Sequence, residues 1–216
     1  MYRKSLFGCI VAVMLFLGAP HAEANSGFYI GLGAAYNTFG GGDLDGSQAL
    51  SDGREVIILP DLDSAVGFDL LLGQRMNDAW AIEFNFMSSA HNGTWEGLKG
   101  DSTYTSVSFN GKYSFLRENR VRPYLLLGLG YQRLLIKKGA ADIYTGAVAD
   151  ASLYGYGLNF GTGIDIYLNQ KVSVTMGVLY RYLEYTEAAG VHQSASIDDG
   201  VDGSGFSFLL TTAYHF

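Results

Sequence analysis

The sequence predicts an all-β protein, an eight-stranded antiparallel up-and-down transmembrane β-barrel. Apolar and polar residues alternate in eight segments, which is the period of a β-strand. The connections between these segments alternate between short and long. The chain ends on an apolar strand, "GFSFLLTTAYHF", whose last residue is Phe216. Beyond residue 24, no stretch holds the roughly 18 apolar residues that a membrane-spanning helix needs.

The first four expected strands each place large apolar side chains on one face and mostly small or polar ones on the other. They are "GFYIGLGAAYN" (27–37), "SAVGFDLLLGQR" (64–75), "WAIEFNFM" (80–87) and "STYTSVSFNGKYSF" (102–115). In the first strand, Phe28, Ile30 and Leu32 alternate with Gly31 and Gly33. This alternation is typical of a strand whose two faces meet different surroundings.

The last four expected strands repeat the pattern. They are "RPYLLLGLGYQRL" (122–134), "LYGYGLNFGTGIDIYL" (153–168), "VSVTMGVLYRY" (172–182) and "GFSFLLTTAYHF" (205–216). A soluble barrel would turn its apolar face inward, whereas a membrane barrel turns that face toward lipid. Gly, Ser, Asn and charged residues on the minor face favour the membrane barrel, as do aromatic residues at the strand ends. An apolar terminal strand is also safe from aggregation if it closes a barrel.

The connections predict which end of the barrel faces outward. The short turns contain "MNDA", "LRENRV" and "NQK", and we expect them on the periplasmic side. Four long segments, residues 38–63, 88–102, 134–152 and 184–204, would be extracellular loops. They contain fifteen acidic residues, which makes the expected outer surface acidic.

The N-terminus has the pattern of an export signal. "MYRK" is basic, "SLFGCIVAVMLFLGA" is apolar, and Ala22-Glu23-Ala24 is a small-x-small cleavage site. We therefore expect a cleaved signal peptide over residues 1–24 and one barrel domain over residues 25–216. "LFGC" looks like a lipoprotein processing site, but most of the apolar run follows Cys9 instead of preceding it. Without Cys9, the mature chain has no cysteine for a disulfide, a nucleophile or a metal site.

The charge argues against nucleic acid as a partner. The whole chain has 14 Lys and Arg against 21 Asp and Glu, a formal net charge of −7. Binding to a phosphate backbone needs clustered basic residues, which an acidic chain of this kind does not supply.

Several segments resemble a known family. "GFYIGLGAAY", "LLGQRMNDAWAIEF", "RPYLLLGLGY" and the closing "AYHF" are similar to the small outer-membrane β-barrel proteins, which include OmpX, the opacity proteins and the transmembrane domain of OmpA. The resemblance covers the whole mature chain and implies a barrel in the bacterial outer membrane. It also implies that Tyr214 and Phe216 belong to a C-terminal signal read by the barrel-assembly machinery. It implies no single activity, because the family shares a scaffold and not a reaction.

Six charged residues fall on the face expected to point inward. They are Asp69, Arg75, Glu83, Lys112, Asp165 and Arg181. The interior of an eight-stranded barrel is filled by side chains, and an unpaired charge there is costly. We therefore expect a polar core of ion pairs, with Glu83 and Lys112 as the best pair. The alternative is a narrow gated pore in which these pairs rearrange.

Catalysis is the least favoured reading of the histidines. His91 follows Ser88 and Ser89 in an expected loop, lacks the His-x-Ser signature of outer-membrane deacylases, and has no rigid strand beneath it. His215 would face the periplasmic rim, away from surface lipid. The acidic runs "GGDLDG" and "IDDGVDG" lack the ligand spacing of a calcium loop. We expect no enzyme activity, no metal and no cofactor.

The expected function is non-catalytic. Surface-exposed loops would support envelope integrity or interaction with a host or another surface, through an extracellular ligand of unknown identity. Arg133, with Lys137 and Lys138 above it, would contact lipopolysaccharide phosphates. One alternative is a narrow channel for small apolar solutes, similar to OmpW. A second alternative is a lipid A-modifying enzyme.

Overall fold

The computed structural model describes residues 27–40, 44, 46–49, 54–95, 98–116, 119–192 and 194–216. The expected signal peptide, residues 1–24, lies outside the described residues. Within the described part of the chain, no helix is long and apolar enough to cross a membrane. The strands are β1 (Phe28–Asn37), β2 (Gly46–Ala49), β3 (Glu55–Leu59), β4 (Asp61–Leu62), β5 (Ala65–Arg75), β6 (Trp80–Trp95), β7 (Leu98–Ser114), β8 (Val121–Asp142), β9 (Val148–Tyr167), β10 (Val172–Ala189), β11 (Ser194–Asp202) and β12 (Gly205–His215).

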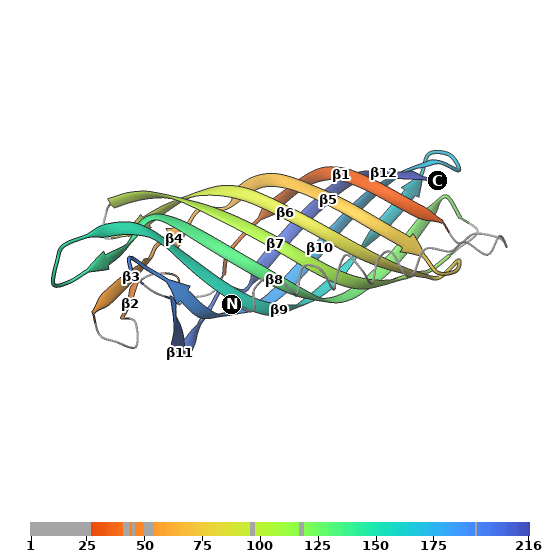
Figure 1. The fold of residues 1–216 in the computed structure, drawn as a ribbon. Coiled ribbons are helices and arrows are strands. Elements are labelled where there is room, and N and C mark those ends of the chain that lie inside the picture. Colours follow the sequence, from red (N-terminus) through yellow and green to blue (C-terminus); the bar gives the residue numbers. More distant parts are fainter. Residues whose placement is uncertain are drawn as a thin grey trace.

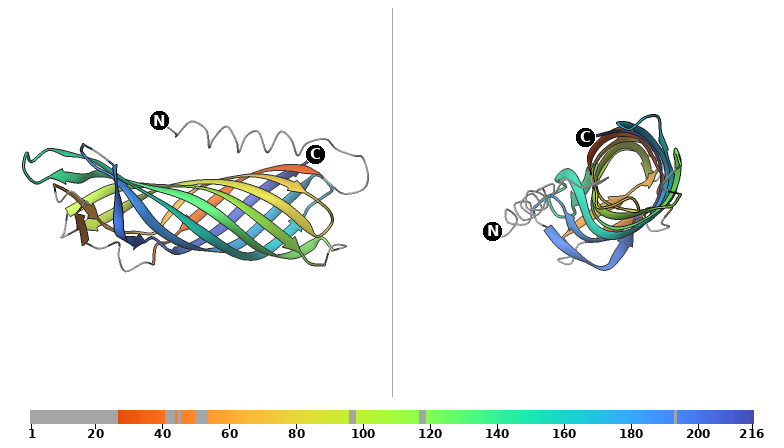
Figure 2. Two further views of the ribbon diagram at one scale, coloured as in Figure 1. Left: turned by 60° about the horizontal axis from the view of Figure 1, so that its bottom comes forward. Right: turned by 90° about the vertical axis from the view of Figure 1, so that its right-hand side faces the viewer.

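Eight of these strands close into a ring of antiparallel neighbours (Figure 1). The order around the ring is β1, β5, β6, β7, β8, β9, β10 and β12, and β12 pairs back onto β1 from Tyr29↔His215 to Asn37↔Ser207. The end-on view in Figure 2 shows the closed ring. The predicted eight-stranded up-and-down barrel is confirmed. Closure gives the apolar strand β12 two hydrogen-bonded neighbours, so it has no free edge.

Asparagines shape the short turns at the end of the barrel where the chain terminates. The Asn77 side chain accepts hydrogen bonds from the backbone N–H groups of Ala79 and Trp80, at 2.9 and 3.0 Å. Asn169 does the same for Lys171 and Val172. A short polar side chain that holds two backbone donors is a local reason for the chain to reverse here.

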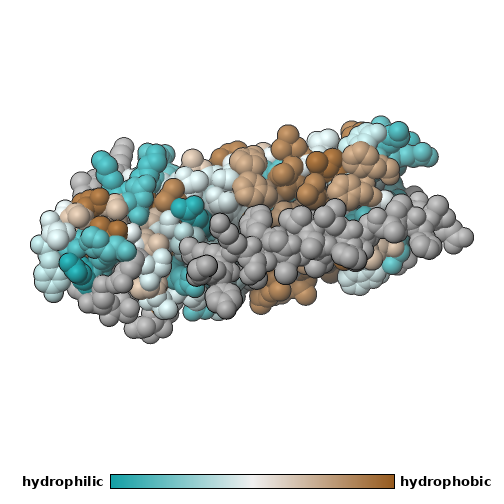
Figure 3. Space-filling view, viewed as in Figure 1, coloured by the Kyte–Doolittle hydropathy of each residue, from teal (hydrophilic) through white to brown (hydrophobic). Residues whose placement is uncertain are grey.

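An apolar belt surrounds the part of the barrel near these turns. Leu, Ile, Val, Met and Phe side chains point outward from every strand of the ring, exposed on all of them except β6, where Ile82, Phe84 and Phe86 are half-buried, and the belt is visible in Figure 3. Aromatic pairs border it on both sides. Trp80–Tyr113 and Phe28–Phe216 lie on the turn side, and Tyr36–Phe208 and Tyr131–Tyr156 lie on the other. An apolar belt between aromatic girdles is the expected outer surface of a membrane barrel.

The strands extend well beyond this belt at the other end. β8 has 22 residues and β9 has 20, whereas a tilted strand needs only about 9–11 residues to cross a membrane. The four segments expected as loops are therefore largely strands, which corrects the sequence-based expectation. The side views in Figures 1 and 2 show this extension, which carries β2, β3, β4 and β11. β3 pairs with β8, β4 with β6, and β11 with β10.

The polarity of the two faces reverses where the strands leave the belt. Within the belt of β10, Met176 and Val178 face outward while Ser173 and Thr175 are buried inside. Further along the same strand, Leu183, Tyr185 and Ala188 are buried inside while Glu184 and Glu187 are exposed. The extension is thus built like a soluble barrel, with its apolar side chains inward and its charges in water.

Candidate functional site: the barrel interior and its extracellular cap

An ion centre lies inside the barrel at the level of the apolar belt. Lys112 Nζ lies 3.1 Å from Glu83 Oε1 and 2.9 Å from Asp165 Oδ1. The Tyr29 hydroxyl donates to Glu83 at 2.7 Å, and the Thr175 hydroxyl donates to Asp165 at 2.7 Å. All three charged side chains are almost fully buried. One cation thus faces two carboxylates, and each carboxylate has a further neutral donor.

Two inward-facing tyrosines complete this centre, and sequence reasoning did not assign them. Lys112 Nζ lies 4.1 Å from the centre of the Tyr124 ring, which places the ammonium over its π face. A Cβ at Gly163 or Gly177 would overlap the Tyr124 hydroxyl, and a Cβ at Gly73 would overlap the Tyr29 ring. The signal that could have found them is a tyrosine on the small-residue face of its strand, opposite glycines on neighbouring strands.

Asp69 lies in the same polar core but is not part of an ion pair among the described residues. Its carboxylate accepts a hydrogen bond from Thr211 Oγ1 at 2.8 Å and lies 3.5 Å from Asn85 Nδ2. A row of amides continues from there, because Asn110 donates to Asn85 at 2.9 Å and Asn159 donates to Asn110 at 3.2 Å. The sequence placed Asp69 inside the barrel but did not predict that neutral donors would satisfy it.

Arg75 lies at the turn end of the barrel, against aromatic rings. Its guanidinium donates to the Tyr167 hydroxyl and lies 5.5 Å from the centre of that ring, and Arg122 covers the same ring at 4.4 Å. Within the described residues, no carboxylate lies within ion-pair distance of Arg75. The expected ion network therefore brings together Glu83, Lys112 and Asp165, and leaves Arg75 outside.

Arg181 is the most deeply buried charge of the six, with an exposed fraction of 0%. Its Nη2 donates to the Thr38 carbonyl at 2.7 Å and lies 3.5 Å from the Phe206 carbonyl, next to the seam between β1 and β12. The guanidinium centre lies 4.7 Å from the Tyr104 ring and 5.2 Å from the Phe39 ring. Aromatic faces and backbone carbonyls surround this cation, and no carboxylate of the described chain pairs with it.

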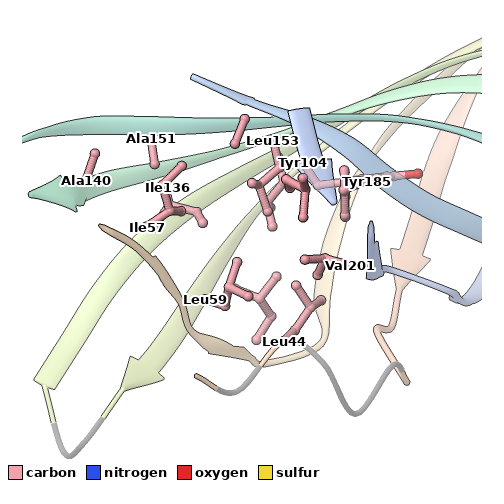
Figure 4. Packing of buried hydrophobic residues seen from close by; sticks show 14 of the residues in the cluster. Leu44, Ile57, Leu59, Tyr104, Ile136, Ala140, Ala151, Leu153, Tyr185 and Val201 are labelled. Atoms are coloured by element: carbon pink, nitrogen blue, oxygen red, sulfur yellow. The ribbon is translucent and has the colours of Figure 1, made fainter. Parts of the chain in front are cut away.

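An apolar core fills the extension directly beyond Arg181. Its buried members come from eight segments of the chain and are Leu44, Ile57, Leu59, Leu62, Tyr104, Leu134, Ile136, Ala140, Ala151, Leu153, Leu183, Tyr185, Ala188, Ile197 and Val201. Figure 4 shows β3 and β11 bringing side chains against those of the barrel strands. We call this cluster the extracellular cap, after the sequence-based prediction that this end of the barrel faces the exterior. It occupies the position where an open pore would need a water-filled mouth.

Backbone and side-chain contacts tie the cap together at its rim. Both oxygens of the buried Glu55 carboxylate accept backbone N–H groups, from Val191 at 2.8 Å and His192 at 2.9 Å. Asp142 accepts N–H groups of Tyr144 and Thr145 and lies 2.9 Å from His192 Nε2. These donors hold the pKa of Asp142 down at about 2, with the Thr145 N–H as the largest cause.

Two small cavities lie inside the barrel among the described residues. One cavity of about 20 Å³ lies beside Lys112 and Asp165 toward the turn end, and another of about 20 Å³ lies beside Asp69 and Glu83 toward the cap. A cavity of this size holds about one water molecule. The ion centre separates the two cavities.

His91 corrects the sequence-based expectation of a loop residue. It lies within β6, points into the barrel and is almost fully buried. Its Nδ1 is 2.7 Å from the Asp63 carbonyl, which can only accept, so Nδ1 carries the proton. Its Nε2 therefore accepts from the Ser89 hydroxyl at 2.7 Å, and Ser89 accepts from Asn37, which in turn accepts from Ser207. The chain joins three strands of the barrel through satisfied hydrogen bonds.

His192 and His215, the other histidines in the described part of the chain, have polar partners. His215 Nε2 lies 2.8 Å from the Ser173 hydroxyl at the turn end, as far from the cap as the barrel allows. Among the described residues, no three His, Cys, Asp or Glu side chains form a group that could hold a metal ion.

The basic residues expected to contact lipopolysaccharide lie at different points along β8 and have different partners. Arg133 lies on the outer face next to the aromatic border, where its Nη2 donates to Ser152 at 3.0 Å. Lys137 and Lys138 lie four and five residues further along β8. Lys137 Nζ lies 3.3 Å from Asp101 Oδ2, and both side chains are exposed.

The C-terminal residues lie on the outer face of the barrel at its turn end. Phe216 donates its backbone N–H to the Phe28 carbonyl at 3.0 Å, and its ring lies 6.0 Å from the Phe28 ring. Tyr214 faces outward beside it, with the two rings 5.1 Å apart. The last residue is therefore held in the girdle and in the barrel seam.

Comparison with known proteins places this architecture. The family model described as "Outer membrane protein beta-barrel domain" matches residues 8–216. A search of curated proteins found no match.

Solved structures give the same answer for the fold. The outer membrane protein OprG from Pseudomonas aeruginosa is 18% identical, with a TM-score of 0.60 over 88% of this chain and 96% of that one. Neisserial surface protein A is 16% identical, with a TM-score of 0.53 over 88% and 97%. Ail, the attachment invasion locus protein of Yersinia pestis, is 18% identical, with a TM-score of 0.51 over 89% and 100%. At these identities the likeness extends to the fold alone.

Proposed function

This chain belongs to the outer membrane protein β-barrel domain family and is an integral protein of the bacterial outer membrane, and from that premise we propose that it is a non-catalytic surface protein with a closed interior. The membrane part serves as an anchor. The extension beyond the membrane presents the surface that acts, either on the neighbouring envelope or on an external partner.

The observation that carries this proposal is the extracellular cap. Strands β3 and β11 add apolar side chains to the inside of the extension, so the outer mouth is filled by a packed core. Lys112, with its two carboxylates, fills the barrel at a second level below it. A packed core across the mouth would block the passage of a channel, whereas it would hold the outer surface of a binding protein rigid.

The buried Ser89–His91 pair supports a non-catalytic role. It has the hydrogen bond that activates a serine nucleophile, but its third member is a backbone carbonyl and both side chains are out of contact with solvent. A lipid or peptide substrate would have to unfold the cap to reach the hydroxyl.

A complementation experiment separates this proposal from the channel alternative. A strain that lacks the protein is complemented with the wild type, with a variant whose β8–β9 hairpin tip (143–147) is replaced by Asn-Gly, or with Lys112→Met. Detergent sensitivity and attachment to host cells are measured. We expect the tip variant to lose the phenotype and Lys112→Met to keep it, provided both reach the outer membrane. The reverse result, with the tip dispensable and the ion centre essential, would contradict the proposal.

A further inference from the structure

The wall of the extension is interrupted between β7 and β8. The pairing of these strands ends at Ser102↔Ile136, and β3 begins to pair with β8 only at Ile57↔Ala140. The β8–β9 register also shifts between Ile136 and Ala140. The three residues 137–139 therefore form a bulge, and no strand of the described chain pairs with it on the side between β7 and β3.

Local backbone geometry holds this bulge in place. Lys138 has a φ of 55°, a left-handed conformation that non-glycine residues adopt rarely. Its backbone N–H donates to Asp150 Oδ1 on β9 at 2.9 Å. A Cβ at the next residue, Gly139, would collide with Ile136, so the tight course of the chain needs glycine there. Bulges of this kind redirect side chains, and here the chain directs two lysines to one opening.

A pocket of about 440 Å³ lies in the opening, well within the size of small-molecule sites, which is roughly 300–1,000 Å³. The tip of the β6–β7 hairpin forms one side, β3 and Pro60 form the second, and the bulge of β8 forms the third. Its lining residues are Ile58, Pro60, Trp95, Gly100, Asp101, Ile136, Lys137, Lys138 and Gly139. The lining is thus apolar and aromatic, with charged groups from Asp101 and the two lysines.

The charges of the pocket favour an anion. The Lys137–Asp101 pair is exposed on both sides, and such pairs hold together with only about 0–1 kcal/mol. Lys138 is exposed and has no ion pair among the described residues. Among the residues that line the pocket, one positive charge is therefore left over, and a second becomes available if Asp101 moves away.

We propose that this pocket binds an amphipathic anion, namely an apolar chain or aromatic ring that carries a carboxylate or phosphate. The apolar part lies against the half-buried side chains of Trp95 and Ile58, and the anionic group meets Lys138 and then Lys137. Two sources carry this chemistry, a lipopolysaccharide molecule beside the barrel and a free amphiphile such as a fatty acid. The inference shares with the proposed function only the extracellular position of the extension. A barrel that conducted ions would leave the pocket unchanged.

Trp95 makes the pocket directly measurable. The chain has two tryptophans, and the other, Trp80, lies in the girdle at the opposite end. Trp80→Phe leaves Trp95 as the single reporter. This protein, in phosphatidylcholine nanodiscs, is titrated with a terminally brominated undecanoate, and with the corresponding brominated alcohol as the neutral probe. We expect saturable quenching by the acid, and a half-saturation about tenfold higher for the alcohol, the loss of one charge-assisted contact.

Paired variants separate the pocket from the membrane. A Cβ added at Gly100 meets nothing within 4 Å, so Gly100→Ala leaves the pocket open while Gly100→Leu fills it. We expect Gly100→Leu to abolish saturable quenching and Gly100→Ala to keep it within twofold. The double variant Lys137→Gln, Lys138→Gln should raise the half-saturation for the acid about tenfold, and Lys171→Gln, in a turn at the far end, should not change it. Folding of each variant is checked by its gel mobility before and after heating.

The same titration identifies the source and can overturn the proposal. Nanodiscs that contain lipopolysaccharide will show a higher half-saturation if lipopolysaccharide groups occupy the pocket, and an unchanged one if free amphiphiles are the ligand. Linear quenching, equal for acid and alcohol and insensitive to Gly100→Leu, would mean that the probe only partitions into lipid, and the proposal would be wrong. It would also be wrong if binding were saturable but indifferent to both lysines.

Discussion

Lys112→Met is the sharpest perturbation of the barrel interior. Met keeps the length and most of the volume of the lysine side chain, so packing against Tyr124 is largely preserved. The substitution removes the one cation that lies within 4 Å of Glu83 and Asp165 among the described residues. The two buried carboxylates then keep only the Tyr29 and Thr175 hydroxyls as donors.

The magnitude follows from burial. Removing one partner of a buried ion pair costs about 3–5 kcal/mol, because the remaining charge is left without compensation. We therefore expect the free energy of unfolding to fall by about 3–5 kcal/mol. Lys137→Met is the matched control, since it breaks an ion pair of similar length, 3.3 Å, in which both side chains are more than half exposed. That variant should change stability by about 0–1 kcal/mol.

The assay is urea-induced unfolding of the barrel refolded into lipid vesicles, followed by tryptophan fluorescence and by gel mobility. Adding Glu83→Gln and Asp165→Asn to Lys112→Met removes the uncompensated charges and should restore stability to within about 2 kcal/mol of wild type. If the unfolding free energy of Lys112→Met lay within about 0.5 kcal/mol of the value for the Lys137→Met control, Lys112 would not be compensating the two buried carboxylates.

Three further predictions concern other parts of the molecule. Gly73→Ala should destabilise the barrel by about 1–3 kcal/mol in the same assay, because its Cβ overlaps the Tyr29 ring. Gly111→Ala, whose Cβ has room, should leave stability unchanged. An equal loss of stability in the two variants would contradict this prediction. Asp142→Asn should lower the thermal stability of the extension at pH 7, because the depressed pKa of Asp142 means that its charged form stabilises the fold. The difference from wild type should shrink below about pH 4 and vanish only below about pH 2, where Asp142 is protonated in the folded protein too, so a pH-independent difference counts against it. Deletion of Phe216 should lower the membrane-inserted yield far more than the stability of the folded barrel, and equal effects on both would argue against an assembly signal.

The sequence was sufficient for the membrane part of the fold. Period-2 alternation with Gly, Ser and charge on one face predicted both the number of strands in the ring and the side that meets lipid. The terminal run to Phe216 predicted that the last strand is closed into the barrel. These features depend on local pattern and on the solvent that each face meets, and both can be read along the chain.

The extension was not predicted from the sequence because its apolar face points inward, whereas the apolar face of the membrane part points outward. In "YRYLEYTEAA" (180–189), the apolar side chains point outward at the start of the segment and inward from Leu183 on. Leu183 and Tyr185 are therefore assigned to the inward face only if this reversal is recognised. If the outward face stays apolar along the whole strand, Glu184 does not fit it, and so the strand was predicted to end and a loop to begin at residue 184. A change of solvent along one strand produces such an inversion, and it marks the outer boundary of the membrane.

The inward charges find partners on strands that meet them inside the barrel, including strands that are not adjacent in the sheet. Sequence spacing does not predict which of these side chains come together. Glu83 and Lys112 lie on adjacent strands, so their pairing was within reach of a hairpin argument. Asp165 joins them from across the interior, and Arg181 finds two rings and a carbonyl instead of a carboxylate. The position of His91 could not be predicted either, because it lies in a strand only as part of the long β6–β7 hairpin of the extension.

We expect this barrel to be closed both at the ion centre and at the extracellular cap. Single-channel recording of the refolded wild-type protein in a planar bilayer tests it most directly. We expect no conductance steps above baseline, for the wild type and for Lys112→Met alike, because the cap still fills the mouth when the ion centre is broken. Stable, reproducible steps from the wild-type barrel would contradict it.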